Sequence, residues 1–138
     1  NIILIQQFRI PTYLNGNNTG LLIETCAGLL DADDPETCII KEIQEETGYT
    51  IEKVTKVFEA YMTPGAVTEK LHCFIAEYTD EMKTNDGGGL VAEQEDIEVL
   101  EMPFPKAIEL LNEGKIKDAK TMLLLQYAII HKLVDISK

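Results

Sequence analysis

Residues 27–49 read AGLLDADDPETCIIKEIQEETGY, and no other stretch of the chain places so many carboxylates at spacings that bring them to one surface. The second half of this stretch predicts a helix. Asp34 suits its N-cap, Pro35 suits the first helical position, where no backbone donor is needed, and Gly48 suits its C-terminal end. We therefore expect a loop that leads into an acidic helix.

Three glutamates make this helix a candidate site. Glu42 and Glu46 lie four residues apart and project from one face, with Glu45 beside them. Like charges this close destabilise a helix unless something neutralises them, and a hard divalent cation with oxygen ligands would do so. A solvated acidic face is the alternative, which these residues alone leave open. Ile39 and Ile43, also four apart, are predicted to form the buried side.

The stretch resembles the Nudix box, whose second half is Arg-Glu, an apolar residue, any residue, Glu-Glu, any residue, Gly and an apolar residue. Residues 41–49 match this half, with Lys41 in place of the arginine. The first half of the box is a glycine, five residues, a glutamate and seven residues. Here Gly28 lies one residue too close to the second half, so the position of that glutamate falls on Asp33 or Asp34. The role of these two aspartates stays open at this point.

The composition favours a single acidic domain. The 138 residues are 45% hydrophobic, which is enough for one domain with a core and short for two. A formal net charge of −12 argues against nucleic acid or an anionic membrane as the main partner. A phosphate substrate would be repelled as well, so bound cations would be needed to invert the field at an acidic site.

The remaining composition signals favour a soluble, cytoplasmic protein. Three cysteines form no CxxC pair and are odd in number, which suggests neither a disulfide framework nor a zinc site. Cys26 is predicted to be a packing residue and not a nucleophile, because no histidine lies beside it in the sequence. No apolar run approaches the length of a membrane span. The first residues lack methionine and are already β-like, so we expect an N-terminal portion to precede this sequence.

The rest of the chain predicts strands, loops and two further helices. The expected elements are a strand in the first residues that ends before Pro11, strands over 20–24, 54–61, 70–78 and 97–102, and helices over 104–113 and 121–133. Both helices are expected to pack on the sheet. Residues 80–93, which include three consecutive glycines, predict a mobile loop.

Three loops carry further candidate side chains. Glu93 or Glu95, at the end of the mobile loop, could take a proton from a water that bound metal has acidified, although a solvated acidic loop is the alternative. Residues 62–69 contain a Pro-Gly turn and a glutamate, and resemble the Nudix branch that hydrolyses ADP-ribose and nucleoside-diphosphate sugars. Lys120 lies among basic residues at the start of the last helix, where a phosphate could bind.

The resemblance extends over nearly the whole chain and narrows to the bacterial GDP-mannose hydrolases of the Nudix family. The segments that carry it, the short box included, are residues 7–9, 14–17, 24–31, 96–101 and 120–125. It implies an α/β fold, an α/β/α sandwich around a mixed β-sheet, for residues 1–138 as one domain. It also implies a homodimer whose additional N-terminal region helps to bind the substrate.

Roles for individual residues follow from the same resemblance. The metal ligands it implies for Mg²⁺ or Mn²⁺ are the carbonyl of Ala27 and the side chains of Glu42, Glu46 and Glu95. The substrate contacts it implies are Arg9, Glu69 and Lys120. Glu45 would support the metal site, and Glu95 would also act as the base. Because the loop before Glu95 is longer than the family's usual form, Glu93 stays an alternative base.

The implied reaction is metal-assisted hydrolysis of the pyrophosphate linkage in a nucleoside-diphosphate sugar. With GDP-mannose the products would be GMP and mannose 1-phosphate. An ADP-ribose pyrophosphatase is one alternative, because no residue of the sequence physically distinguishes guanine from adenine. A catalytically silent Nudix domain that binds a nucleotide is another. Such a domain would be expected to lose one of Glu42, Glu45 or Glu46, and all three are present.

Overall fold

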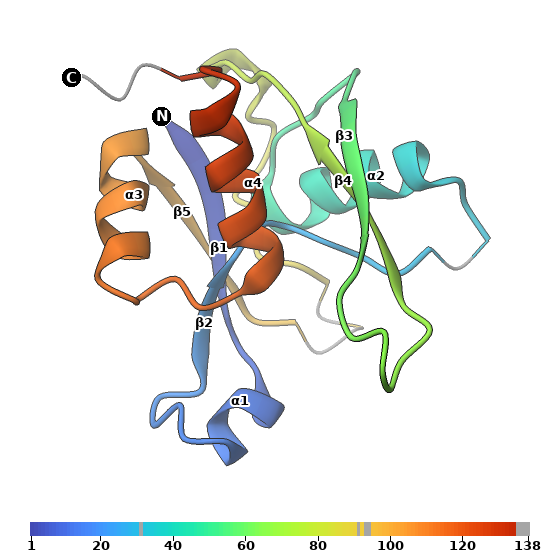
Figure 1. Ribbon diagram of the computed structural model, residues 1–138. Helices are drawn as coiled ribbons and strands as arrows, with labels where there is room; N and C mark the ends of the chain where they lie inside the picture. Colours follow the sequence, from blue (N-terminus) through green and yellow to red (C-terminus); the bar gives the residue numbers. More distant parts are fainter. Residues whose placement is uncertain (31, 91, 93–94, 135–138) are drawn as a thin grey trace. The chain divides into compact units, whose positions relative to one another are not determined.

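The computed structural model describes residues 1–30, 32–90, 92 and 95–134 (Figure 1). Its elements are β1 (Ile2–Phe8), α1 (Ile10–Leu14), β2 (Leu21–Glu24), α2 (Pro35–Thr47), β3 (Thr55–Tyr61), β4 (Lys70–Ile75), the 3₁₀ helix η1 (Asp80–Met82), β5 (Ile97–Met102), α3 (Phe104–Asn112) and α4 (Ala119–Ile130). This content confirms the α/β class. The chain divides into two compact units, the first made of Asn1–Thr25 and the chain from Gly88 onward, the second of Cys26–Gly87.

The first unit is a three-stranded sheet with two helices packed against it. β1 is the central strand and pairs antiparallel with β2 on one side and β5 on the other (Figure 1). The buried core combines strand, helix and loop residues, namely Leu4, Phe104, Ala107, Ile116 and Leu125. The predicted packing of both C-terminal helices on the sheet is therefore confirmed.

Pro11 lies in the first turn of a short helix, α1, where the sequence predicts only the end of a strand. Proline is tolerated in the first turn of α1 because its missing N–H has no partner there. The segment between β1 and β2 turns back on itself, since the backbone N–H of Arg9 donates to the carbonyl of Gly20 at 2.8 Å. A Cβ on Gly20 would lie 2.1 Å from the Phe8 ring, so only glycine permits this approach. Arg9 is thereby fixed at the end of β1.

The second unit contains α2 and the hairpin of β3 and β4. The two strands pair antiparallel from Thr55–Ile75 to Tyr61–Lys70, which confirms the predicted strands except that β4 ends earlier. Every strand pairing in the described ranges is antiparallel, so the parallel pairing that a mixed sheet implies is not among them. Within those ranges no helix has the length and apolar character needed to cross a membrane.

The ends of α2 are those predicted from the sequence. Asp34 accepts hydrogen bonds from the backbone N–H groups of Glu36 and Thr37 at 3.1 and 3.2 Å, and Pro35 occupies the first turn. Gly48 ends the helix in the left-handed conformation with φ of 79°. Local chemistry therefore sets both boundaries.

The buried side of α2 differs from the prediction. Ile39 and Ile43 are only half-buried, whereas the buried residues are Cys38, Glu46 and Thr47. The reason is a distant segment that crosses the last turn, because a Cβ on Gly87 would lie 2.5 Å from the carbonyl oxygen of Glu46. This contact covers the last turn, whereas Cys38, near the other end of the helix, bonds through its sulfur to the carbonyl of Leu29.

The glycine-rich segment, which the sequence predicts to be mobile, contains three backbone conformations that favour glycine. Gly87, Gly88 and Gly89 have φ of 68°, 105° and 79°, in the left-handed region that favours glycine. Before them, η1 follows β4, and Lys83 forms an isolated bridge with Tyr49. The predicted loop thus has defined local structure up to residue 90, while its mobility stays a prediction.

Candidate functional site

Two glutamates of α2 reach neighbouring residues in the segment before the helix. Glu46 is 1% exposed, and its Oε2 accepts a hydrogen bond from the backbone N–H of Ala27 at 3.2 Å. The carboxylate of Glu42 lies against Gly28, the residue after Ala27, because a Cβ built on Gly28 would be 1.7 Å from Glu42 Oε1. A glycine at position 28 is therefore what lets the Glu42 carboxylate approach the backbone.

The chemistry of these groups fits a hard divalent cation. Carboxylate and backbone carbonyl oxygens are the ligands that Mg²⁺ prefers, and here two carboxylates approach residues 27 and 28. Across the part of the chain that the structure describes, no three His, Cys, Asp or Glu side chains form a group that could hold a metal ion. A cation at α2 would therefore also need backbone and non-protein oxygens, and the full ligand set stays a prediction.

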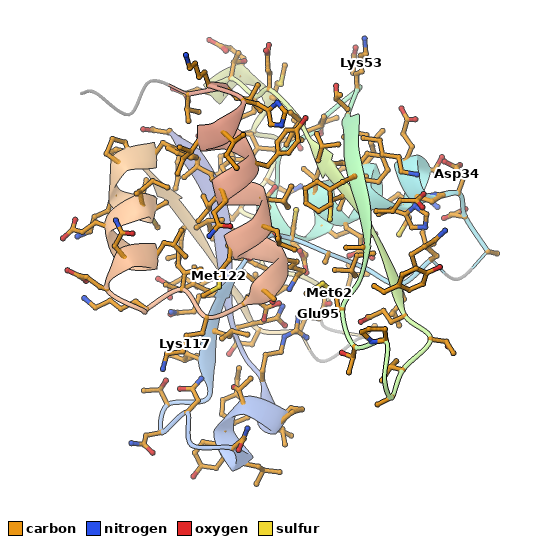
Figure 2. The ribbon with its side chains drawn as sticks, viewed as in Figure 1. Asp34, Lys53, Met62, Glu95, Lys117 and Met122 are labelled. Carbon is orange, nitrogen blue, oxygen red and sulfur yellow. The ribbon has the colours of Figure 1, made fainter. Side chains whose placement is uncertain are left out.

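Asp33 and Asp34 have separate local functions, which the sequence left open. Asp34 caps α2, at whose start Figure 2 labels it. The carboxylate of Asp33 accepts a hydrogen bond from Lys41, the residue that replaces the arginine of the box. This bond raises the pKa of Lys41 above its ordinary value, with a smaller contribution from the charge of Glu45. Glu45 is half-buried, and its supporting role stays a prediction.

In the first unit, two predicted substrate contacts meet on one carboxylate. Glu24, the last residue of β2, is 2% exposed. Arg9 donates from Nε to Glu24 Oε1 at 2.7 Å and from Nη2 to Oε2 at 3.0 Å. Lys120 Nζ donates to the same Oε2 at 2.7 Å. The structure therefore brings Arg9 and Lys120 together through a third residue.

Glu24 is charged at neutral pH despite its burial. Burial raises the pKa of its carboxyl, but the hydrogen bonds and positive charges of Arg9 and Lys120 outweigh that effect and hold the pKa below its ordinary value of 4.5. From the sequence alone, Glu24 is only part of a segment that resembles the family. The available signal was an acid that directly follows the apolar residues 21–23 of a strand, where a charge needs a partner.

Hydrogen bonds also connect the start of α4 to Glu24 and to the residue after it. Lys120 Nζ also bonds Asp118 Oδ1 at 2.9 Å, and Asp118 caps α4 by accepting from the backbone N–H of Thr121 at 3.0 Å. The hydroxyl of Thr121 in turn accepts from the backbone N–H of Thr25 at 2.7 Å. Lys117, another lysine of this basic segment, is exposed, unlike the half-buried Lys120 (Figure 2).

Two other predicted site residues are Glu95 in the first unit and Glu69 in the second. Glu95 is half-buried before β5, and its Oε2 accepts from the backbone N–H of Leu90 at 2.9 Å. A Cβ on Gly89 would lie 2.5 Å from the same oxygen, so the glycine permits this contact. Glu69 is exposed in the loop before β4. Glu93, the alternative base, lies outside the described residues.

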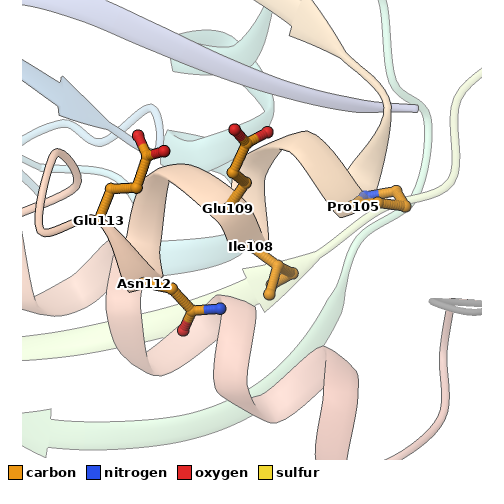
Figure 3. Close-up of a pocket in the computed structure, with 5 residues that line it drawn as sticks. All are labelled: Pro105, Ile108, Glu109, Asn112 and Glu113. Atoms are coloured by element: carbon orange, nitrogen blue, oxygen red, sulfur yellow. The ribbon is translucent and has the colours of Figure 1, made fainter.

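A hollow on the first unit contains none of the predicted site residues. It lies along α3 and is lined by Pro105, Ile108, Glu109, Asn112 and Glu113 (Figure 3). Its two carboxylates are bonded to lysines, Glu109 to Lys106 and Glu113 to Lys115, each at 2.8 Å. No described residue of this lining is a cation that could bind a phosphate.

Known proteins similar to this chain belong to one family. The model of the NUDIX domain family matches residues 1–125. Relatives include the GDP-mannose pyrophosphatases of Shigella dysenteriae serotype 1 and Escherichia coli O157:H7, each 58% identical over 134 residues, which is 97% of this chain and 69% of theirs. Another is the GDP-mannose pyrophosphatase of Pectobacterium atrosepticum, 60% identical over 129 residues, 94% of this chain and 66% of its own.

Proposed function

The chain belongs to the Nudix family, and we propose that it hydrolyses the pyrophosphate bond of a nucleoside-diphosphate sugar, namely GDP-mannose. The observation that carries this proposal is the identity of 58% or more, over nearly the whole chain, to relatives named GDP-mannose pyrophosphatases. The products would be GMP and mannose 1-phosphate. An enzyme that cleaves at phosphorus needs cation ligands, phosphate-binding cations and a proton acceptor.

We propose that Mg²⁺ or Mn²⁺ is bound by the Ala27 carbonyl and by Glu42, Glu46 and Glu95, with support from Glu45. The contacts of Glu46 with Ala27 and of Glu42 with Gly28 support the part of this set that lies in the second unit. When bound, the cation supplies charge neutralisation on the phosphates and polarisation of the phosphorus. Without it, a protein of net charge −12 would repel its substrate.

The proton acceptor in this proposal is Glu95. As the water oxygen bonds to phosphorus and the bridging P–O bond breaks, the water's proton passes to the Glu95 carboxylate and the departing phosphate takes the bond's electron pair. The hydrogen bond from the Leu90 N–H to Glu95 Oε2 at 2.9 Å restricts that carboxylate's orientation, which supports a positioned base. Glu93 stays the alternative.

Arg9, Lys120 and Glu69 are the proposed substrate contacts. A guanidinium binds a phosphate through its planar fork of donors, and an ammonium acts as a compact charge. Arg9 suits this role because its side chain keeps 42% of its surface exposed. Glu69, exposed in its loop, could accept hydrogen bonds from sugar or base groups.

A panel of nucleotide sugars assayed with Mg²⁺ tests the proposal. We expect kcat/KM for GDP-mannose to exceed that for ADP-ribose by at least about tenfold, the discrimination that one lost hydrogen-bonding group can give. A preference for ADP-ribose would favour the alternative enzyme. Tight binding without turnover of any compound would favour a silent domain, although all three helix glutamates are present.

We also propose a homodimer and a cytoplasmic location. The first rests on the resemblance to GDP-mannose hydrolases. The second is supported by the three cysteines, all within the described residues, which form no disulfide. Sedimentation of the full-length protein should give the mass of a dimer, and a monomer at every concentration would contradict the first proposal.

A further inference from the structure

Glu24 connects three segments of the first unit. Its carboxylate accepts two hydrogen bonds from Arg9, which follows β1, and one from Lys120, in the first turn of α4. Its own strand pairs with β1, and the next residue, Thr25, donates to the hydroxyl of Thr121. The backbone on both sides of the carboxylate is therefore held by the fold, which makes its position well defined.

Arg9 and Lys120 need an anion between them. The positive charges of Arg9 and Lys120 repel each other, and little water screens the charges of Lys120 and Glu24, whose exposed fractions are 16% and 2%. Asp118, at 2.9 Å from Lys120, supplies a second negative charge. Arg9 differs from these buried groups, because its side chain keeps 42% of its surface exposed and can be reached from solvent.

We propose that Glu24 is a positioning residue for the substrate's phosphates, because it fixes Arg9 and Lys120 in place before the substrate arrives. This inference rests on the proposed function, which makes those two residues substrate contacts. A guanidinium held by two hydrogen bonds has already lost most of its freedom, so a phosphate that binds it incurs little further ordering cost. Glu24 acts only through its partners, since at 2% exposure it has almost no surface to offer a ligand.

The alternative is that Glu24 only stabilises the fold. Three variants of the full chain separate the two roles. Glu24→Gln keeps the shape but removes the charge and turns an N–H towards a cation. Glu24→Asp keeps the charge, but its shorter side chain cannot hold both partners. Glu109→Gln is the matched control, because it breaks an exposed ion pair with Lys106 on α3 of the same unit.

The experiment measures the binding of GDP-mannose by NMR titration with Mg²⁺ present. Every protein compared, the reference with Glu24 intact included, carries Glu95→Gln, so that turnover is expected to be roughly 10²–10⁴-fold slower. Glu24→Gln should weaken binding roughly tenfold to hundredfold, the loss expected for hydrogen bonds to charged groups. Glu24→Asp should remain folded and weaken binding by about fivefold, and Glu109→Gln should stay within about twofold of the reference. If Glu24→Gln fails to fold, Glu24→Asp decides the question.

A second readout reports on Arg9 directly. The Nε–H signal of Arg9 should be sharp and protected from exchange in the wild type, because it donates to Glu24 Oε1 at 2.7 Å. It should shift when GDP-mannose is added, and broaden in Glu24→Asp although the backbone spectrum is unchanged. A merely structural role would leave the ligand-induced shift the same in every folded variant.

The outcomes separate the two proposals. Equal affinities of the reference and the folded Glu24 variants would overturn the positioning role, even if the wild type hydrolyses GDP-mannose with Mg²⁺. Weaker binding by the Glu24 variants, with a reference that binds and a wild type that hydrolyses no nucleotide sugar, would overturn the proposed function and leave the positioning role intact. Absence of GDP-mannose binding by the reference would overturn the positioning role, and absence of hydrolysis by the wild type with Mg²⁺ as well would overturn both.

Discussion

Replacing Gly28 by alanine should displace the Glu42 carboxylate and weaken Mg²⁺ binding. The added Cβ would lie 1.7 Å from Glu42 Oε1 and 2.5 Å from Glu42 Cγ. Restoring an ordinary van der Waals separation requires the carboxylate oxygen to move by about 1.7 Å or more. The backbone itself tolerates alanine, because Gly28 is not among the glycines with positive φ.

A displacement of this size is large on the scale of metal coordination. Mg²⁺ demands oxygen ligands at about 2.0–2.1 Å, with a tolerance of about 0.2 Å, so a carboxylate moved by about 1.7 Å no longer coordinates. We expect a loss of about 10²-fold in kcat/KM at limiting Mg²⁺, the usual effect of misplacing a functional group by about an ångström. The assay titrates Mg²⁺ against GDP-mannose hydrolysis, and calorimetry measures Mg²⁺ binding directly.

Two controls tie the effect to Glu42. Gly65→Ala makes the same substitution where an added Cβ meets nothing within 4 Å, so its Mg²⁺ affinity should equal that of the wild type. In a Glu42→Ala background, Gly28→Ala should add little further loss, because the group it displaces is already gone. Wild-type Mg²⁺ affinity in Gly28→Ala, or an equally large loss in the Glu42→Ala background, would refute this reasoning.

Two further predictions concern the acids. Glu46→Gln should weaken Mg²⁺ binding so that part of the activity returns at high Mg²⁺, whereas Glu95→Gln should lower kcat roughly 10²–10⁴-fold at every Mg²⁺ concentration. A larger loss in Glu93→Gln than in Glu95→Gln would assign the base to Glu93. Because the folded-state pKa of Glu24 is lowered, its contribution to the free energy of unfolding is full above its ordinary pKa of 4.5 and is lost as the pH falls below it. Urea unfolding between pH 7 and 2 should therefore show a shallower acid decline for Glu24→Gln, and an unchanged decline would contradict this.

The helix of the acidic stretch was predictable because its signals are local. Asp34, Pro35 and Gly48 act within one turn of their own positions, and the structure places each in its predicted role. The burial of Glu46 was not predictable in this way. Its carbonyl lies close to Gly87 and its side chain accepts a hydrogen bond from Ala27, and both neighbours are distant in the sequence.

The contacts of Glu24 lie beyond sequence patterns for the same reason. Its partners are 15 and 96 residues away, and no periodicity connects positions so far apart. Arg9 was found only through the family resemblance and Lys120 mainly through it, and a resemblance that assigns roles position by position says nothing about the carboxylate that joins them. The glycines at 87–89 show a related limit, since composition alone does not distinguish a flexible linker from a turn that needs positive φ.

The most direct test of the central claim is to identify the products of GDP-mannose incubated with the full-length protein. Cleavage of the pyrophosphate bond predicts GMP and mannose 1-phosphate in equal amounts, formed with Mg²⁺ and absent in excess chelator. Release of GDP and free mannose would show attack at the glycosidic bond instead. That result, or undiminished activity in excess chelator, would contradict the account.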